Sequence, residues 1–358
     1  MRARFLLAIG LVAASTAQAQ SSVTLFGTLD ATLSRYSVKG GPSQTVLANS
    51  GLNNSALGFR GTEDLGGGLW TGFWLEGAVA NDEGSPNGFN FMRRSTVSLG
   101  GPWGEVRLGR DFTPTFWNDA IFDPFGASGA GSNIINQARG TATLPGRMLF
   151  APGFGANNPN YIRASNSVAY FLPRTLGGVY GQVQYALHEQ SAAGSQQGRF
   201  VGARLGYANG PLNTAVAMST SAGSHPTTAG APDIRSANLG ASYDFGVLRG
   251  MAEVTRESYE VAGARSTGKG YLVGVQVPMG AVRFRVAYST WKVDRAGMPR
   301  AGKLALGAVY DLSKRTALYA TYARINNGNT ALLPVGGSAT GPAGAATTGI
   351  DLGIRHNF

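Results

Sequence analysis

The sequence of 358 residues contains no cysteine and only three histidines. Without cysteine the chain has no disulfides and no thiolate ligands for zinc, and the three scattered histidines do not have metal-ligand spacing. The pattern also offers no grouping of a base with a nucleophile of the kind that catalysis needs. We therefore expect no metal, no cofactor and no enzymatic activity.

Charged residues and long apolar runs are also scarce. Charged residues make up 14% of the chain, and beyond the N-terminus no stretch approaches the ~20 apolar residues of a transmembrane helix. The net charge of +11 suggests nucleic acid as a partner, but the basic residues occur singly, without long runs or a recognition-helix pattern. We expect no nucleic-acid partner, and we expect any membrane crossing to use a β-barrel.

The first 19 residues have the three parts of a secretory signal peptide. Arg2 and Arg4 precede the apolar run 5–14, and Ala17-Gln18-Ala19 is a small-x-small cleavage site. Removing Arg2 and Arg4 from the 30 basic residues leaves 28 against 19 acidic residues, a net charge of +9. We predict that residues 1–19 are a signal peptide and that residues 20–358 form one domain.

From Val23 onward, apolar and polar residues alternate with period two. Leu25, Leu29 and Leu33 share one face, while Thr28 and Asp30 fall on the other. Such alternation predicts strands with unlike faces, and a soluble sandwich shows it as well as a membrane barrel. Alternation alone therefore leaves both classes open.

Connection lengths favour the barrel. Short turns alternate along the chain with longer polar links, which is typical of an outer-membrane barrel with an even number of strands. The short turns are at 63–68, 100–102, 173–178, 209–211, 244–246, 278–280 and 311–314. The longer links are at 37–54, 81–88, 111–162, 188–198, 222–233, 257–268, 294–300 and 326–346. Seven turns and eight links predict an all-β fold, an antiparallel transmembrane β-barrel of sixteen strands.

The link 111–162 is far longer than the others and contains no convincing strand. A structureless insert of this length inside a compact domain is uncommon unless it has a function. We predict that this third outer loop folds into the barrel and sets the width and charge of a pore.

The last predicted strand alternates to the final residue. Ile350, Leu352, Ile354, His356 and Phe358 share one face, and the sequence stops on an aromatic residue. We expect this strand to lie in the barrel wall.

Four stretches of the chain resemble the general porins of Gram-negative bacteria, of the β-proteobacterial type. They are residues 23–30, 57–68, 104–110 and 353–358. In this order, and with the long insert between the fifth and sixth predicted strands, the resemblance covers nearly all of the chain after the signal peptide. It implies a homotrimer of sixteen-stranded barrels. It also implies that Phe358 and its face, with His356 and Ile354, form a signal for outer-membrane assembly.

The family's pore places acids of the third loop opposite wall arginines. By this resemblance Asp123 is the loop acid, with Asp119 as a second candidate, and Arg94 and Arg163 are the wall arginines. Alternation places the same two arginines on the inner face, because an outward arginine at the bilayer midplane costs ~2–4 kcal/mol. The inner set also includes other arginines of the chain: Arg60, Arg107, Arg204, Arg249, Arg283 and Arg285.

Simpler interpretations of these residues stay open. An inward arginine also occurs as a solvated lumenal residue or as the partner of an acid on a neighbouring strand. Asp123 precedes Pro124, and Asp-Pro is a common turn sequence.

We predict an outer-membrane general diffusion channel for small hydrophilic solutes and inorganic ions. An excess of inward arginine favours weak anion selectivity. A substrate-specific channel for a sugar or an anionic solute is the alternative. The partners expected with this function are outer-membrane lipids and lipopolysaccharide.

Overall fold

The structure is a computed structural model that describes residues 22–84, 90–140, 161–189, 198–222, 233–261, 264–294, 300–328, 333–336 and 341–358. The signal peptide predicted at 1–19 lies outside the described residues.

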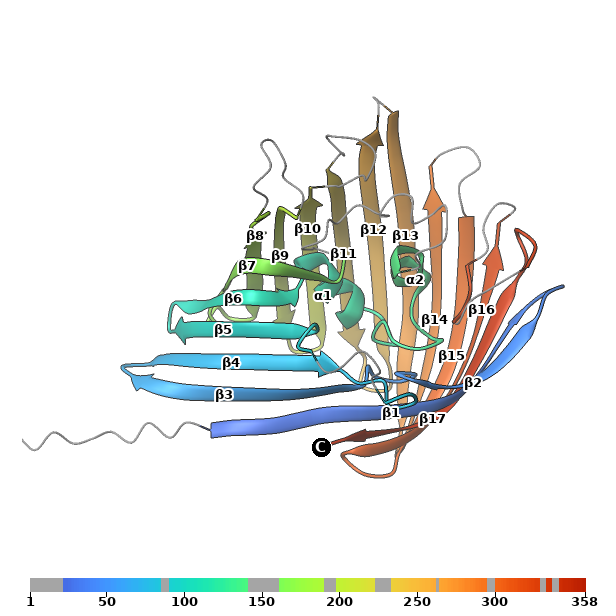
Figure 1. Cartoon of the computed structure of the whole chain (residues 1–358), viewed down its shortest axis with the longest axis horizontal. Coiled ribbons are helices and arrows are strands. Elements are labelled where there is room, and N and C mark those ends of the chain that lie inside the picture. The colour runs from blue at the N-terminus through green and yellow to red at the C-terminus, as the bar shows by residue number, and fades with distance from the viewer. Residues whose placement is uncertain are drawn as a thin grey trace, which may run out of the picture.

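The described residues form one antiparallel sheet of seventeen strands, and pairing of the first strand with the last closes it into a barrel (Figure 1). The strands are β1 (Ser22–Val38), β2 (Ser43–Asn49), β3 (Ala56–Gly66), β4 (Leu69–Ala78), β5 (Arg94–Gly101), β6 (Gly104–Phe112), β7 (Arg163–Phe171), β8 (Val179–Ala186), β9 (Phe200–Asn209), β10 (Leu212–Ser221), β11 (Ile234–Asp244), β12 (Arg249–Val261), β13 (Ala264–Met279), β14 (Val282–Val293), β15 (Arg300–Asp311), β16 (Thr316–Asn327) and β17 (Thr347–Asn357).

The barrel nevertheless has sixteen wall positions, as predicted. Both β2 and β3 pair with the long strand β1, β2 opposite residues 31–37 and β3 opposite residues 22–28. They therefore occupy successive parts of one wall position, separated by the short segment 50–55.

Two of the predicted links are partly wrong. The link 37–54 contains β2, and the link 257–268 is a tight hairpin in which β12 runs to Val261 and β13 begins at Ala264. This hairpin is among the tallest features of Figure 1. Both links were predicted from their polar composition. Strands of a barrel can extend beyond its apolar band when the neighbouring strand extends as well, and polar residues there belong to paired strands.

The side chains alternate as predicted, with the apolar face outward. On the outer face Val273 stands opposite Tyr288 and Val286 opposite Leu306, and all four are 40–51% exposed. The inner face carries buried polar residues such as Asp30 and Ser34. A soluble barrel has the opposite arrangement, so this wall is suited to lipid. Neither helix in the described part of the chain is long and apolar enough to cross a membrane.

The long insert folds inward, as predicted, but it is not structureless. It contains α1 (Pro114–Ile121) and α2 (Ile134–Gly140), and both lie within the curve of the sheet (Figure 1). Thr113 caps α1 by accepting a hydrogen bond from the backbone N–H of Phe116 at 3.3 Å, and Pro114 occupies the first turn. Each helix is two turns long, too short for periodicity to reveal.

Candidate functional site

Four arginines lie on one side of the barrel: Arg60 on β3, Arg94 on β5, Arg107 on β6 and Arg163 on β7. We call them the arginine wall. Alternation turns Arg60, Arg94 and Arg107 inward, because their neighbours Phe59, Ser95 and Leu108 belong to the outer face. Arg163 does not follow this rule: its neighbour Ala164 is fully buried opposite the inward Asp111, and the register between β6 and β7 shifts between Gly109 and Asp111. The prediction of an inward Arg163, which counted from Val168, crosses this irregularity and is not supported by alternation. All four were named from the sequence as wall arginines, and the expected inward direction holds for Arg60, Arg94 and Arg107.

Arg60 and Arg94 share one aromatic ring. The guanidinium carbons lie 5.2 Å and 4.6 Å from the ring centre of Trp74 on β4. Arg60 also lies 5.2 Å from the ring of Phe26. That ring fits because Gly58 stands directly opposite Phe26 on β3, where an added Cβ would come within 2.5 Å of it. The two charges are thus held apart by a rigid, flat side chain.

Arg107 is fixed by two acids of its own strand. Its guanidinium lies 2.8 Å from Glu105 and 2.5 Å from Asp111, and 4.0 Å above the ring of Phe171. Asp111 also lies 3.7 Å from Arg94. The acids that partner the wall arginines here therefore come from β6 and not from the loop tip.

Arg163 makes one backbone contact and one ring contact on this side of the barrel. Its Nε donates to the carbonyl oxygen of Arg93 at 2.7 Å, and the guanidinium lies 4.7 Å from the ring of Phe112. Arg93 in turn bonds Glu76 at 2.6 Å. Glu76 is an inward residue of β4 that also accepts from Trp74 at 3.0 Å. Glu76 is thus the third acid of this wall, after Glu105 and Asp111, that neutralises part of the basic cluster.

Asp123 does not face the arginine wall. Its carboxylate accepts hydrogen bonds from the backbone N–H groups of Phe125, Ala127 and Asn133 and from the Asn133 side chain, at 2.8–3.2 Å. The residue is 2% exposed. Burial raises the pKa of the Asp123 carboxyl, and the four hydrogen bonds oppose that rise. The arrangement is that of a turn residue shaping the loop, the simpler of the two interpretations left open by the sequence.

Asp119 lies on α1, against the part of the wall formed by β9–β11. Its carboxylate accepts from the side chain of Asn238 on β11 at 3.1 Å, and it is fully buried. The neighbouring Asn118 receives a hydrogen bond from Arg204 of β9 at 2.6 Å. Both contacts fix α1 to the wall of β9–β11, and neither brings Asp119 to the arginine wall.

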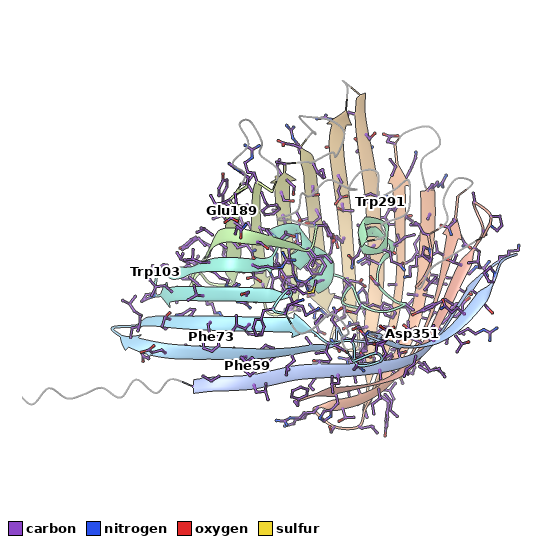
Figure 2. The ribbon with its side chains drawn as sticks, in the orientation of Figure 1. Phe59, Phe73, Trp103, Glu189, Trp291 and Asp351 are labelled. Carbon is purple, nitrogen blue, oxygen red and sulfur yellow. The ribbon has the colours of Figure 1, made fainter. Side chains whose placement is uncertain are left out.

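The second half of the loop is docked on β14–β16 by apolar packing. Ile134 and Ile135 of α2 are fully buried, in one cluster with Trp291 of β14, which Figure 2 shows beside the helix. The remaining members of this buried cluster are Phe125, Ala130, Ile234, Ala287, Val293, Ala301, Ala305, Ala323, Ile325, Leu333 and Val335. This part of the lumen is closed by packing.

Polar contacts complete the docking. Lys303 of β15 is 1% exposed, and its Nζ donates to the Ser132 carbonyl oxygen at 2.6 Å and to Gln137 at 2.7 Å. Asp351 of β17 accepts from the backbone N–H of Ala130 at 2.8 Å. Inward charges of this wall therefore hold the loop.

A cavity of about 650 Å³ remains between α1 and the wall formed by β5–β9. Arg94, Arg107 and Arg204 line it, together with Glu105 and the ring of Trp117. Water and small solutes have access to arginines here, in contrast to the packed region around α2.

Comparison with known proteins places this architecture. A family model described as Gram-negative porin matches residues 6–330. Outer membrane porin protein 32 of Delftia acidovorans is 40% identical over 366 residues, which cover 99% of both chains. The chain belongs to the Gram-negative porin family. It is therefore an outer-membrane diffusion channel.

Further relatives agree with this assignment. An outer membrane porin protein of Bordetella pertussis is 30% identical over 99% of both chains. Among solved structures, an anion-selective porin from Comamonas acidovorans superposes with a TM-score of 0.83 at 36% identity, covering 95% of this chain and 100% of the other. OmpF of Salmonella typhi, at 17% identity and a TM-score of 0.63, shares the fold and covers 94% of this chain and 97% of its own.

The last strand of this porin closes the barrel against β1. Phe358 and Gly27 exchange backbone hydrogen bonds of 3.1 Å, and the Phe358 ring occupies the space beside that glycine. Ile354 and Phe358 are 46% and 40% exposed on the outer face. His356 lies 2.9 Å from Thr316 through Nδ1 and Oγ1. The face predicted for the assembly signal is thus an outer, accessible one.

Sequence reasoning missed the acids of the wall and the role of Lys303. Glu76 and Glu105 share the inward parity of Trp74 and Arg107, so alternation was a usable signal for them. The signal for loop docking is an inner face that is apolar, as at Ala287 and Trp291 of β14. A pore-lining strand has polar residues there instead.

Proposed function

We propose that this general diffusion channel prefers anions weakly and that the arginine wall creates the preference. The observation that carries the proposal is the lining of the open cavity, which includes four arginines, Arg94, Arg107, Arg174 and Arg204, and one carboxylate, Glu105. Fixed charge of one sign in a narrow aqueous passage raises the local concentration of the opposite ion. Rings of arginine are the usual device of anion pores.

The contacts of the arginines suit this task. A guanidinium stays charged at any physiological pH, and stacking on Trp74 or Phe171 holds it in place while leaving its edge open to water. Glu76, Glu105 and Asp111 offset part of the charge, which is consistent with a weak preference. The similarity to a porin described as anion-selective supports the same sign.

For the constriction we propose a division of labour. Arg60, Arg94, Arg107 and Arg163 supply the charge on one side. Asp119 and Asp123 act indirectly, because their hydrogen bonds fix the path of the loop that narrows the lumen.

The test is the reversal potential of the refolded protein in a planar bilayer under a salt gradient. Arg94→Gln should move it toward cation preference, whereas Arg35→Gln, which removes an exposed arginine from the outer face of β1, should not. Asp123→Asn should leave it unchanged, because that carboxylate lies within the loop. Cation preference of the unmodified protein would refute the charge argument while keeping the channel.

We further propose a homotrimer with outer-membrane lipids and lipopolysaccharide around it, and an assembly role for Phe358, His356 and Ile354. An exposed apolar outer face supports contact with lipid. Crosslinking in native membranes tests the trimer. Refolding of Phe358→Ala, compared with assembly of the same variant in cells, tests the signal: loss in cells alone supports it, and wild-type assembly in cells contradicts it.

One observation favours a narrower function. Arginines paired with aromatic rings recur along the lumen, at Trp74, Phe171, Phe112 and, for Arg204, Tyr180 at 4.8 Å. Such pairs suit organic anions with a flat apolar part. If benzoate at low concentration blocks chloride current and acetate does not, the channel is selective for that class.

A further inference from the structure

Four cations stand in one row across the outer face of the barrel. The strand register places Arg256 of β12 opposite Lys269 of β13, Lys269 opposite Lys292 of β14, and Lys292 opposite Arg300 of β15. All four side chains are exposed. We call this set the basic row.

The basic row lies where the apolar band ends. Below Lys292 the outward residues of β14 are Thr290, Tyr288, Val286 and Phe284, and the last three are 40–43% exposed. From Val282 to Lys292 the strand advances about 34 Å at about 3.4 Å per residue, and a tilt of about 40° reduces this to about 26 Å, close to the ~25 Å apolar band of such barrels. The row is thus at headgroup level, at the end of the barrel opposite the short turns.

Like charges directly opposite each other across paired strands are destabilising. The one ion pair of the basic row in the described part of the chain joins Lys269 to Asp294 at 3.8 Å, with both side chains about 60% exposed. A pair so exposed contributes little. The row therefore has excess positive charge that an external anion would stabilise.

A groove is built beside the row. Its volume is about 920 Å³, and Lys269, Lys292 and Arg300 line it with Tyr271 and Tyr288. Gly302 keeps the groove open, since an added Cβ would come within 2.8 Å of the Tyr288 hydroxyl. The cations lie at headgroup level and the aromatic rings lie toward the apolar band. This arrangement is complementary to an amphiphile with an anionic head and an apolar tail.

We propose that the basic row and its groove bind the phosphate-bearing headgroup of a glycolipid in the outer leaflet, with its acyl chains along the apolar face of β13–β15. The inference deepens the proposed partnership with outer-membrane lipids and is independent of ion selectivity. A free phosphate would not require the apolar band, and a second copy of this chain would have to bring acids to the row.

The experiment measures retention of lipid by the refolded protein in neutral detergent, by native mass spectrometry at fixed salt. The probes are diphosphoryl lipid A, its monophosphoryl form and phosphatidylcholine. Lys292→Gln/Arg300→Gln should weaken binding of diphosphoryl lipid A roughly 10- to 30-fold, at roughly fivefold for each basic residue near an anionic surface. Lys314→Gln/Arg315→Gln, which removes two exposed cations from the turn at the other end, should bind as the wild type does.

Stability gives an independent readout. Without lipid, Lys292→Gln/Arg300→Gln should melt no lower than the wild type, because it relieves like-charge repulsion. With diphosphoryl lipid A, the wild type should gain more in melting temperature than the variant. The exchange Lys292→Arg/Arg300→Lys keeps both charges and should keep binding.

Three outcomes would overturn the proposal. Undiminished retention by the glutamine variant would show that the row is not used. Equal retention of phosphatidylcholine would show that the apolar face acts alone. Competition by excess inorganic phosphate would identify a site for the free ion.

Discussion

The two sides of the lumen use inward charges in different ways. On β3–β7 the arginines lie over aromatic rings, pair with acids of the same wall and, at Arg94 and Arg107, line an open cavity. On β15 and β17, Lys303 and Asp351 are buried and bonded to the loop. Both sets point inward. What separates them is the loop, which buries Lys303 and Asp351 and leaves the side chains of Arg94 and Arg107 partly exposed, at 15% and 12%.

The difference shows that an inward charge is not by itself a pore-lining charge. A desolvated cation such as Lys303 is stable only when it has fixed hydrogen-bond partners. The partners in turn need the lysine as their buried donor. An arginine at the edge of a cavity, such as Arg94 or Arg107, keeps part of its guanidinium open to ions although its contacts hold it in place. Substitutions on the two sides should therefore affect different properties, stability and loop position on one, selectivity on the other.

The largest effect is expected from Ile135→Ala, which truncates a fully buried side chain of α2 where the helix packs on the barrel wall. Losing such a side chain costs about 2–5 kcal/mol, enough to weaken docking of the loop. Single-channel conductance should rise and fluctuate. The matched control, Ile350→Ala, removes an outward isoleucine that is 41% exposed and should not change conductance. Unchanged conductance in Ile135→Ala would mean that the polar contacts suffice to hold the loop.

Lys303→Met should lower stability without changing selectivity. It leaves the Ser132 carbonyl and the Gln137 side chain without their buried donor, at a cost of about 1–3 kcal/mol, while retaining most of the side-chain volume. The denaturation midpoint should fall below that of the wild type, and the reversal potential should remain unchanged. Arg94→Met is the counterpart and should show the reverse pattern. A shift of reversal potential in Lys303→Met would place this lysine in the ion path.

The smallest effect is expected from Glu105→Gln on the arginine wall. It removes a charge that lies 2.8 Å from Arg107, while Asp111 continues to hold the guanidinium. Anion preference should increase by a factor of roughly two, because a single charge acting through water contributes less than ~1 kcal/mol. The permeability ratio from reversal potentials measures it. A decrease would show that Glu105 acts mainly by orienting Arg107.

Much of the fold was predictable because strand alternation is a local pattern. The outward leucines of β1, the inward arginines of β3–β6 and the inward course of the insert all follow from residues close in sequence, or from resemblance to a known family. The helices α1 and α2 were not predictable, because each is too short for its periodicity to stand out. The hairpin of β12 and β13 was misjudged because its polar residues look like a loop.

By itself the sequence determined the class of the protein, its sixteen wall positions and the face of most charges within regular strands. Only the tertiary structure decided which charges meet water, because that depends on contacts between residues far apart in the chain. Lys303 bonds Ser132 across 171 residues, and Ala130 bonds Asp351 across 221. Alternation says nothing about such pairs, and the same pattern therefore produced an arginine-lined passage on one side and a docked loop on the other.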